Sequence, residues 1–377
     1  MILTIPKSTI LSMLDATARS VGQIGGAGMV MIDAAGGLDL RTADGTTEAS
    51  AYTDSASISR DGRVMVDHRL LSQAVKSLPD APVSLSMDGR GKGLVVKGDG
   101  KGGARFSLNV ADTADFPPSM QDRIGEGATL ARFAGPDFAL TVARVAYAVS
   151  RDESRYGLNG IHIEATSDDD GDLCRLVATD GSRLAWAEME VEQGAIVRPA
   201  KRLVPPAFLG AVAAVCRDAA TVALSMSQHG LSATVEASGV TVTLCSRWMD
   251  GEFPHYRQII DGIKTATTVT LRRGDLAASI RRVGIMATGL HRLVTVTTSA
   301  DEVRLSAAGD MGDSSEVVNA SVEGADGWRS GVNAAFLADA LGQSVGEMVR
   351  LDLGQPLDPI CIPGPRMLAL IMPMRID

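Results

Sequence analysis

The segment Ser150–Glu188 reads SRDESRYGLNGIHIEATSDDDGDLCRLVATDGSRLAWAE, and it joins a polar loop to strand-like runs that two turns separate. The first turn is the acidic run Ser167–Asp172, and the second is the sequence TDGSR at Thr179–Arg183. Residues Gly135–Val149, directly before this segment, show the apolar period of about 3.6 residues that is typical of a helix. The segment therefore indicates a unit in which one helix is followed by a few antiparallel strands.

The same unit recurs along the chain at a nearly regular interval. Six segments show helical periodicity, and their starts lie 60, 68, 70, 67 and 61 residues apart. Unrelated helices have no reason to keep such an interval, so the spacing predicts one supersecondary unit that is used six times. The predicted helices are Lys7–Val21, Asp67–Leu78, Gly135–Val149, Pro205–Arg217, Arg272–Thr288 and Asn333–Gln343.

Strand-like runs rich in Val, Thr, Leu and Ser lie between these helices, and turn signals such as Asp88-Gly89 and His229-Gly230 bound them. Sheet therefore outweighs helix, and we predict an α+β fold in which each domain packs two helices on antiparallel sheets. The predicted strands are Arg63–Val66, Val83–Met87, Gly93–Lys97, Thr221–Met226, Val240–Cys245, Val294–Thr298 and Glu302–Ser306.

Two helices per domain divide the 377 residues into three similar domains, which we expect at residues 1–125, 126–250 and 251–377. Both expected boundaries lie near a turn of the type acid-Phe-Pro, in which Phe116 and Phe253 stand 137 positions apart. So short a motif can recur by chance, and the helix spacing is therefore the stronger evidence for the division.

Composition excludes several classes of protein. With 45% apolar and 21% charged residues the chain is not a disordered one, and its longest apolar runs, such as Phe208–Cys216, are too short to span a membrane as a helix. The first residues, MILTIPKSTI, lack the pattern of a secretory signal, so we expect a cytoplasmic protein. The cysteines match neither a CxxC pair nor a dense disulfide framework, and we predict free, mostly buried thiols at Cys174, Cys216, Cys245 and Cys361.

The distribution of charge says more than the net charge of −9, which taken alone argues against a nucleic-acid partner. The six predicted helices hold ten basic and five acidic residues, so they carry +5 and the rest of the chain carries −14. If all the helices faced one surface, an acidic protein would present a basic face to a polyanion. The alternative, that these are ordinary solvated helix faces, stays open, because the sixth predicted helix has no basic residue.

Motifs for catalysis, metals and cofactors are mostly absent. The glycine-rich stretch Asp88–Gly103 lacks the Ser or Thr and the helix that follow Gly-Lys in a phosphate-binding loop, so we interpret it as hairpin turns. The acidic run Ser167–Asp172 does not place carboxylates where a calcium loop needs them. Five scattered histidines show no metal-ligand spacing, and no GxSxG sequence is present to activate a serine. We therefore predict no catalytic residue, no metal and no cofactor.

Four strings carry a resemblance to a known family: SRDESRYGLNGIHIE (Ser150–Glu164), LVATDGSRLAWAE (Leu176–Glu188), EFPHYRQII (Glu252–Ile260) and IMPMRID (Ile371–Asp377). In order and spacing they resemble blocks of the bacterial DNA polymerase III β subunit family, the sliding clamps. The strings FSLNV and DFPP, within Phe106–Pro118, resemble the end of the first domain in that family. The resemblance runs from about residue 105 to the C-terminus, and the N-terminal domain matches mainly by pattern.

The resemblance implies a homodimer in which six copies of a two-helix domain close head to tail into a ring, with helices around the hole and sheets as the outer wall. Double-stranded DNA would thread this DNA clamp without sequence specificity, and the ring would tether the replicative polymerase without catalysing a reaction itself. The implied partners are the polymerase subunit, the clamp loader, repair polymerases and other proteins with clamp-binding peptide motifs, with no membrane partner. The alternatives are a divergent or mobile-element-encoded clamp that serves repair or accessory replication, and a hydrolase on an α+β fold, which no motif supports.

Long basic side chains on the helices are the expected DNA contacts, because they reach phosphates and carry no information about base sequence. Those expected to line the hole are Arg144, Arg273, Arg281 and Arg282. By resemblance, Arg151, Arg155 and Tyr156, in the loop after the third predicted helix, are expected to contact DNA near the face of the ring. The alternative for Arg155 is an ion pair with Asp152 or Glu153.

The resemblance also implies a cleft between the second and third domains that receives a short, extended partner peptide with hydrophobic anchors. Apolar side chains suit this role because they form a deformable floor, while Gly181 lets a chain approach closely and Arg183 offers donors to polar peptide groups. Without the resemblance, the C-terminal Met-Pro-Met would be more typical of core packing. The implied cleft residues are Leu158, Thr179, Gly181, Arg183, Leu184, Pro254, Ile259, Leu370, Met372, Pro373, Met374 and Arg375.

The dimer interface implied by the resemblance joins an edge strand of the first domain to the residues after the fifth helix of the partner's third domain. It would pair Arg105, Phe106 and Leu108 with Ile285 and Met286.

The chain also departs from the family pattern. Ser182 stands where the family commonly has His, and Gln258 stands where Arg is usual, so we expect altered preferences among partner motifs. The stretch Gly22–Met31 lacks the Arg and Pro found near the first helix in many clamps, which argues against a DNA contact there.

Overall fold

The computed structural model describes residues 1–20, 23–24, 27–98, 104–125, 129–168, 171–194, 200–289, 292–309, 312–324 and 327–376. Parts of three stretches discussed above lie outside these residues: the stretch from Gly22 to Met31, the glycine-rich stretch and the acidic run. The chain forms three similar units, joined by two linkers.

The first unit holds two helices and two groups of strands. Its elements are β1 (Ile2–Ile5), α1 (Lys7–Thr17), the 3-10 helix η1 (Ala18–Ser20), β2 (Gln23–Ile24), β3 (Ala27–Ala34), β4 (Leu38–Ala43), β5 (Thr47–Thr53), β6 (Ser57–Arg60), β7 (Gly62–Asp67), α2 (His68–Ser77), β8 (Val83–Met87), β9 (Gly93–Gly98) and β10 (Arg105–Asn109). The first linker contains the 3-10 helix η2 (Thr113–Asp115) and the short helix α3 (Met120–Gly125).

The second unit repeats this order. Its elements are β11 (Thr129–Ala134), α4 (Gly135–Ala146), β12 (Ile161–Asp168), β13 (Gly171–Thr179), β14 (Arg183–Glu190), β15 (Gln193–Gly194), β16 (Ala200–Val204), α5 (Pro206–Cys216), β17 (Thr221–Met226), β18 (Gly230–Ala237) and β19 (Val240–Arg247). The second linker contains the short helix α6 (Tyr256–Asp261).

The third unit repeats it again. Its elements are β20 (Thr267–Arg272), α7 (Arg273–Val283), β21 (Leu293–Ser299), β22 (Glu302–Gly309), β23 (Gly312–Gly324), β24 (Arg329–Asn333), α8 (Ala334–Gln343), β25 (Met348–Leu353), β26 (Ile360–Gly364) and β27 (Met367–Ile371). Apart from the short strands β2, β6 and β15, each unit has a strand that leads into the first helix and three strands that follow it, and the same sequence then repeats around the second helix.

All six predicted helices are present, each shorter than predicted at one end or both, and the predicted strands are present as well. Local capping explains two of the starts. The Asp67 carboxylate accepts the backbone N–H of Leu70 at 2.7 Å at the start of α2, and Asn333 accepts the N–H of Ala335 at 2.9 Å at the start of α8. The sequence did not indicate the linker helices α3 and α6, because six residues are too few to show a helical period.

Strands pair across both joints between units. Thr47–Tyr52 of β5 pair antiparallel with Thr241–Ser246 of β19, and Arg183–Ala187 of β14 pair with Met367–Ile371 of β27. The sheets therefore run on from one unit to the next. One apolar core extends through the first and second units, and a second core fills the third unit. All four cysteines are free and buried, as predicted.

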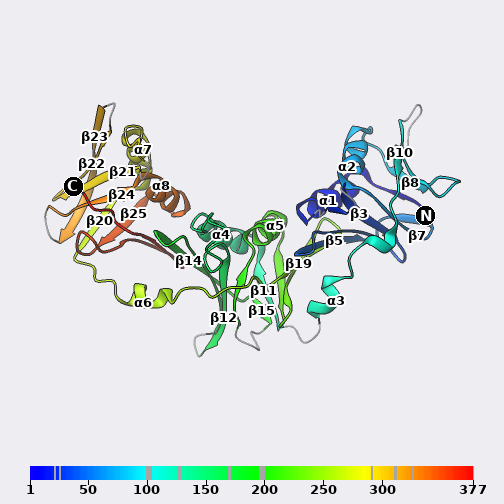
Figure 1. Cartoon of the computed structure of the whole chain (residues 1–377), viewed down its shortest axis with the longest axis horizontal. Coiled ribbons are helices and arrows are strands. Elements are labelled where there is room, and N and C mark those ends of the chain that lie inside the picture. Colours follow the sequence, from blue (N-terminus) through cyan, green and yellow to red (C-terminus); the bar gives the residue numbers. More distant parts are fainter. Residues whose placement is uncertain are drawn as a thin grey trace.

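Figure 1 shows that the units form an arc, with α1, α2, α4, α5, α7 and α8 on its inner side and the sheets and both linkers toward its outer side. The predicted α+β fold with three similar two-helix domains is confirmed, while the expected domain boundaries stay a prediction. In the part of the chain that the structure describes, no helix is long and apolar enough to cross a membrane.

Candidate functional site

The β13–β14 turn forms a rigid corner at the joint between the second and third units. Its Asp180 carboxylate accepts the backbone N–H groups of Ser182 at 2.9 Å and Arg183 at 3.1 Å. Gly181 has a φ of +89°, in the left-handed region that favours glycine. Across the joint, the N–H of Met372 donates to the Ser182 carbonyl at 2.9 Å, which fixes the C-terminal segment against this turn.

The second linker passes beside the same corner. Phe253 is buried, and its ring stacks on His162 with ring centroids 4.8 Å apart. Turn, linker and C-terminal strand together enclose a pocket of about 140 Å³, which we call the joint cleft. Its lining residues are Arg155, Leu158, Thr179, Gly181, Arg183, Leu184, Pro254, Tyr256, Ile259, Leu370 and Met372.

Nine of the twelve residues expected in the cleft line this pocket. Pro373, Met374 and Arg375 do not. The N–H of Met374 donates to the Gly331 carbonyl at 2.8 Å, which turns the end of the chain toward β24, and Met374 and Arg375 line a separate open pocket beside Leu357.

Two lining residues, Arg155 and Tyr256, were not expected in the cleft, although both stand in strings that carry the family resemblance. Arg155 donates from Nη1 to the Asp180 carbonyl at 2.7 Å, so it lies over the turn. Asp152 instead accepts hydrogen bonds from Ser154, and among the described residues Arg155 forms no ion pair with Asp152 or Glu153. The exposed guanidinium of Arg155 is the cation at the rim of the cleft.

Arg183 lines the cleft, but its Nε and Nη1 groups are paired within the protein. Its guanidinium is largely buried, with Nε 2.9 Å from Asp180 and Nη1 2.6 Å from Asp339 of α8, and it lies over the Phe336 ring at 4.3 Å. Because Asp339 and Phe336 belong to the third unit, Arg183 ties the second and third units together.

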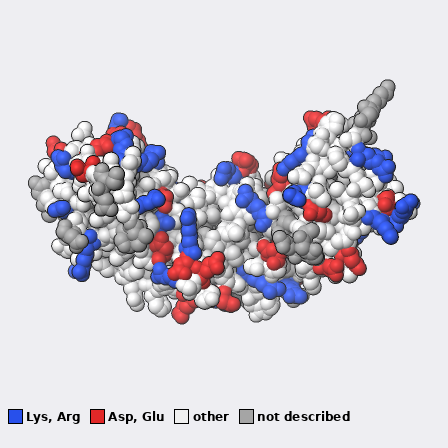
Figure 2. All heavy atoms as spheres, turned by 45° about the horizontal axis from the view of Figure 1, so that its top comes forward, with Lys and Arg blue, Asp and Glu red and all other residues white. Residues whose placement is uncertain are grey.

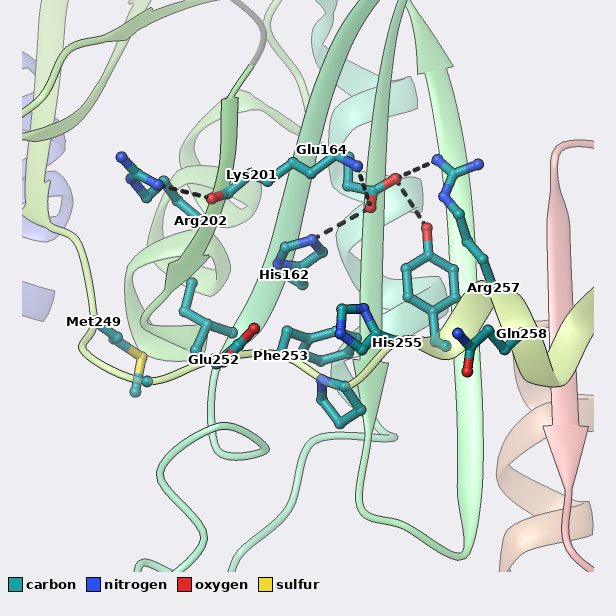
Figure 3. A pocket seen from close by; sticks show the side chains of 14 residues that line it. His162, Glu164, Lys201, Arg202, Met249, Glu252, Phe253, His255, Arg257 and Gln258 are labelled. Atoms are coloured by element: carbon teal, nitrogen blue, oxygen red, sulfur yellow. Dashed lines mark hydrogen bonds and ion pairs between the residues drawn. The ribbon is translucent and has the colours of Figure 1, made fainter.

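A larger pocket of about 560 Å³ lies on the other side of the second linker, and Figure 3 shows its side chains. The buried Glu164 accepts hydrogen bonds from the Tyr256 hydroxyl at 2.9 Å and from Arg257 at 2.6 Å, and His162 Nε2 lies 3.4 Å away. Burial raises the pKa of Glu164, but the hydrogen bonds from His162, Arg257 and Tyr256 outweigh burial and lower the pKa to about 2. An ionised Glu164 therefore anchors the linker and holds Tyr256 in the wall of the joint cleft.

Two of the arginines expected to line a hole donate to carbonyl groups of the fold. Arg144 is only 7% exposed, and its Nη1 donates to the Pro365 carbonyl of the third unit at 3.3 Å. Arg273 donates to the carbonyls of Leu341 at 3.3 Å and Gly346 at 3.0 Å, at the end of α8. Both side chains satisfy carbonyl groups of the fold, so we withdraw them as DNA contacts.

The remaining expected contacts are exposed. Arg281 donates to the carbonyl of Ala277 in its own helix, Arg282 pairs with Glu316 of β23 with Nε at 2.9 Å, and Arg151 has no ion pair with any described residue. Tyr156 is 71% exposed. Figure 2 shows Lys and Arg side chains on the inner side of the arc. Three further exposed arginines lie at or near helix ends. They contribute to the positive charge of the predicted helices but were not among the expected DNA contacts: Arg19, Arg69 and Arg217.

Two strand edges at opposite ends of the arc are open. β10 pairs only with β9 among the described strands, and its Phe106 and Leu108 are half-buried while Arg105 is exposed. β23 pairs with β22 along residues 312–319 and with β20 along residues 320–324, so one edge of its first half has no described strand partner. Near β23, Ile285 is 70% exposed and Met286 is half-buried.

Three domain families match consecutive parts of the chain. They are described as the N-terminal, central and C-terminal domains of the DNA polymerase III beta subunit, and they match residues 1–121, 134–255 and 263–375. Together they span nearly the whole chain.

Whole proteins match over most of their length. The chain is 28% identical over 327 residues to the beta sliding clamp of Caulobacter vibrioides, covering 85% of this chain and 84% of that protein. It is also 28% identical over 350 residues to the beta sliding clamp of Synechocystis, covering 87% and 85%. A DNA polymerase sliding clamp structure from Pseudomonas aeruginosa aligns over 100% of both chains with a TM-score of 0.89 and 25% identity. A sliding clamp structure from Caulobacter crescentus does so with a TM-score of 0.87 and 26% identity.

Proposed function

The chain belongs to the DNA polymerase III β subunit family, the bacterial sliding clamps of DNA replication, and we propose that two copies close head to tail into a ring around duplex DNA. A closed ring stays on DNA because release requires breaking an interface, so each protein–DNA contact can be weak. Weak, sequence-independent phosphate contacts let the ring slide, whereas tight base contacts would hold it in place.

The repeat itself supports ring closure. If the two-residue strand β2 is left out, the third strand after the first helix of a unit is β5, β14 or β23, and the third strand after the second helix is β10, β19 or β27. At both joints within the chain, a strand of the first kind pairs with a strand of the second kind: β5 with β19 and β14 with β27. The two strands left over are β23 and β10, at opposite ends of the arc.

A partner copy would supply the pairing strand that each open edge lacks. β10 of one chain would pair antiparallel with β23 of the other, which repeats the joint seen twice within the chain and covers both of these edges once two copies meet. Phe106 and Leu108 would then lie near the exposed Ile285 of the partner copy. This equivalence of strands is the single observation that carries the proposed ring.

The inner side of that ring suits a duplex. Arg19, Arg69, Arg217 and Arg281 are exposed on the helices or at their ends, and among the described residues none of them is paired with a carboxylate. Their guanidinium groups are therefore free to exchange counterions for DNA phosphates, although the whole chain is acidic. We propose Arg151 and Tyr156, in the loop after α4, as further contacts near the face of the ring.

We propose the joint cleft as the docking site for short peptides of the replicative polymerase subunit, the clamp loader and repair polymerases. Leu158, Leu184 and Leu370 form an apolar floor, and Ile259 and Met372 are exposed at its rim. Each buried apolar anchor of a peptide contributes about 1.5–3 kcal/mol before the costs of association, so two or three anchors give roughly micromolar binding. Such binding allows partners to exchange.

We further propose that the protein is a non-catalytic subunit that works in the cytoplasm on the replicating chromosome. No feature of the described residues or of the relatives favours an accessory clamp over the main replicative one.

Sedimentation equilibrium tests the ring. We expect a dimer for the unchanged chain and folded monomers for the variant that combines Phe106→Ala with Ile285→Ala, because each of the two facing edges loses an apolar side chain. The paired control is Leu140→Ala, which removes an exposed apolar side chain from α4 far from both open edges. A monomeric unchanged chain at micromolar concentration, or a dimer that the double variant leaves intact, would reject the proposed closure.

A further inference from the structure

The joint between the first and second units repeats the backbone frame of the joint cleft. In the β4–β5 turn, the Asp44 carboxylate accepts the N–H groups of Thr46 at 2.8 Å and Thr47 at 2.6 Å, as Asp180 does in the β13–β14 turn. Gly45 has a φ of +86°, close to the +89° of Gly181. The two turns therefore have the same local structure.

The segments around the two turns also correspond. The N–H of Arg247, the last residue of β19, donates to the Thr46 carbonyl at 3.1 Å, as Met372 donates to Ser182. Each linker then places a buried phenylalanine and a proline beside its turn: Phe116 with Pro117, and Phe253 with Pro254. A short helix follows in both, α3 in the first linker and α6 in the second.

This frame encloses a second pocket of about 370 Å³, which we call the first-joint pocket. The residues that matter for its chemistry are Gly45, Glu48, Pro117, Met120, Arg123 and Arg247. Its position is equivalent to that of the joint cleft, but its lining is different in kind.

Three charged residues replace three apolar ones. Glu48 stands at the position of Leu184, since each pairs with the last residue of the preceding strand across the hairpin. Arg247 stands at the position of Met372, and Arg123 is the fourth residue of its linker helix, as Ile259 is of α6. The apolar floor and rim of the joint cleft thus become a carboxylate and two guanidinium groups.

The carboxylate of this pocket is already satisfied within the protein. Glu48 is buried, pairs with Arg41 at 2.9 Å and accepts the backbone N–H of Met120 at 2.7 Å. Arg41 in turn lies over the Phe116 ring, with its guanidinium carbon 5.7 Å from the centroid. The negative charge of Glu48 is therefore balanced by a neighbour that does not line the pocket.

The two positive charges at the rim are not balanced in this way. Arg123 and Arg247 are both exposed, and neither forms an ion pair with another residue in the described part of the chain. His229, also exposed, lies on the same rim. The pocket therefore presents a cationic rim around the apolar surfaces of Pro117 and Met120.

We propose that the first-joint pocket binds an extended acidic peptide, whose carboxylates pair with Arg123 and Arg247 while an adjacent apolar side chain packs on Pro117 and Met120. Charge complementarity selects the occupant, and the backbone frame shared with the joint cleft accommodates an extended chain. The site lies in a different joint from the joint cleft, so it is a second docking site that acidic partners can use while the joint cleft is occupied.

Fluorescence anisotropy on the full chain tests this. The probe is a labelled nonapeptide in which Asp and Leu alternate, compared with the same peptide carrying Lys in place of Asp. We expect the Asp peptide alone to bind, and Arg123→Gln and Arg247→Gln each to weaken it about two- to fivefold, the range of one exposed charge pair. Arg90→Gln removes another exposed arginine, from the β8–β9 turn, and should leave binding unchanged.

Further variants and competitors in the same binding experiment identify the site and its ligand. Arg247→Glu should reverse the preference so that the Lys peptide binds instead, and Ile259→Ser in the joint cleft should have no effect on the Asp peptide. Unchanged affinity in both glutamine variants, or an equal loss in Arg90→Gln, would overturn the site. Full displacement of the peptide by inorganic phosphate or by short duplex DNA at equal concentration would overturn the peptide as its ligand. Dimerisation in sedimentation is measured separately, so failure here leaves the ring proposal standing.

Discussion

Leu70 and Phe336 occupy the same position in two repeats, since each is the third residue of the second helix of its unit and follows a side-chain cap, Asp67 or Asn333. Phe336 contacts the neighbouring unit through Arg183, whose guanidinium lies 4.3 Å from the ring centroid. Leu70 has no neighbouring unit within the chain and is 45% exposed. In a closed ring, the partner copy would cover Leu70.

Leu70→Glu should therefore weaken the dimer without unfolding the protein. Burying a leucine at an interface contributes about 1.5–3 kcal/mol, so its loss at each of two interfaces should raise the dimer dissociation constant by roughly two orders of magnitude or more. Sedimentation equilibrium measures that constant, and Leu140→Glu on α4 is the matched control with a similarly exposed leucine. Equal dissociation constants for the two variants would show that Leu70 lies outside the interface.

Arg183→Met should loosen the joint between the second and third units. The substitution leaves Asp180 and Asp339 without their shared partner, and hydrogen bonds between charged groups contribute about 1.5–3 kcal/mol each. We expect a loss of about 2–3 kcal/mol in urea unfolding. Arg183→Lys should recover only part of it, because a lysine cannot pair with both carboxylates and also stack on the Phe336 ring. Full recovery by lysine would contradict the role of Arg183 as the shared partner of both carboxylates.

The stabilisation that Glu164 gives to the second linker should be lost in acid. The pKa of Glu164 lies at about 2 in the folded chain, below its usual value of 4.5, so the unfolded state binds a proton more readily. Its contribution is therefore fully present above about pH 4.5 and is lost as the pH falls toward 2. A shift of this size corresponds to about 3 kcal/mol. Glu164→Gln should lower stability at pH 7 and flatten the slope of unfolding free energy between pH 5 and 3, and an unchanged slope would contradict this account.

Ile259→Ser should weaken partner docking in the joint cleft. Ile259 is 49% exposed at the rim of the cleft, so its loss removes an apolar contact for a peptide and little packing within the protein. For a labelled peptide with Leu and Phe anchors, we expect about tenfold weaker binding by isothermal titration calorimetry. Val345→Ser, at a similarly exposed position after α8, is the control, and a comparable loss there would mean that the peptide binds elsewhere.

Features set by local periodicity could be predicted from the sequence, and features set by distant contacts could not. The six helices followed from apolar spacing, and nine cleft residues followed from the family resemblance, eight of them within the four strings that carry it. Arg144 was misplaced because the Pro365 carbonyl that it satisfies lies 221 positions away. Met374 was misplaced because its backbone pairs with Gly331, and nothing near it in the sequence indicates that bridge.

The dimer interface expected from the sequence also did not include the open edge of β23. Alternation within a strand indicates which face is buried, but it does not indicate which neighbours pair along each edge. The equivalence of β23 with β5 and β14 is evident only when both joints within the chain are seen in one fold.

Retention on DNA tests the central claim, that the protein holds DNA by encircling it. The chain is loaded with a clamp loader onto nicked circular DNA, and the amount that remains bound is measured by gel filtration before and after the circle is cut once. We predict that most of the protein stays on the circle and is lost within minutes from the linear form at the same ionic strength. Equal retention on both forms would show ordinary surface binding and contradict the ring.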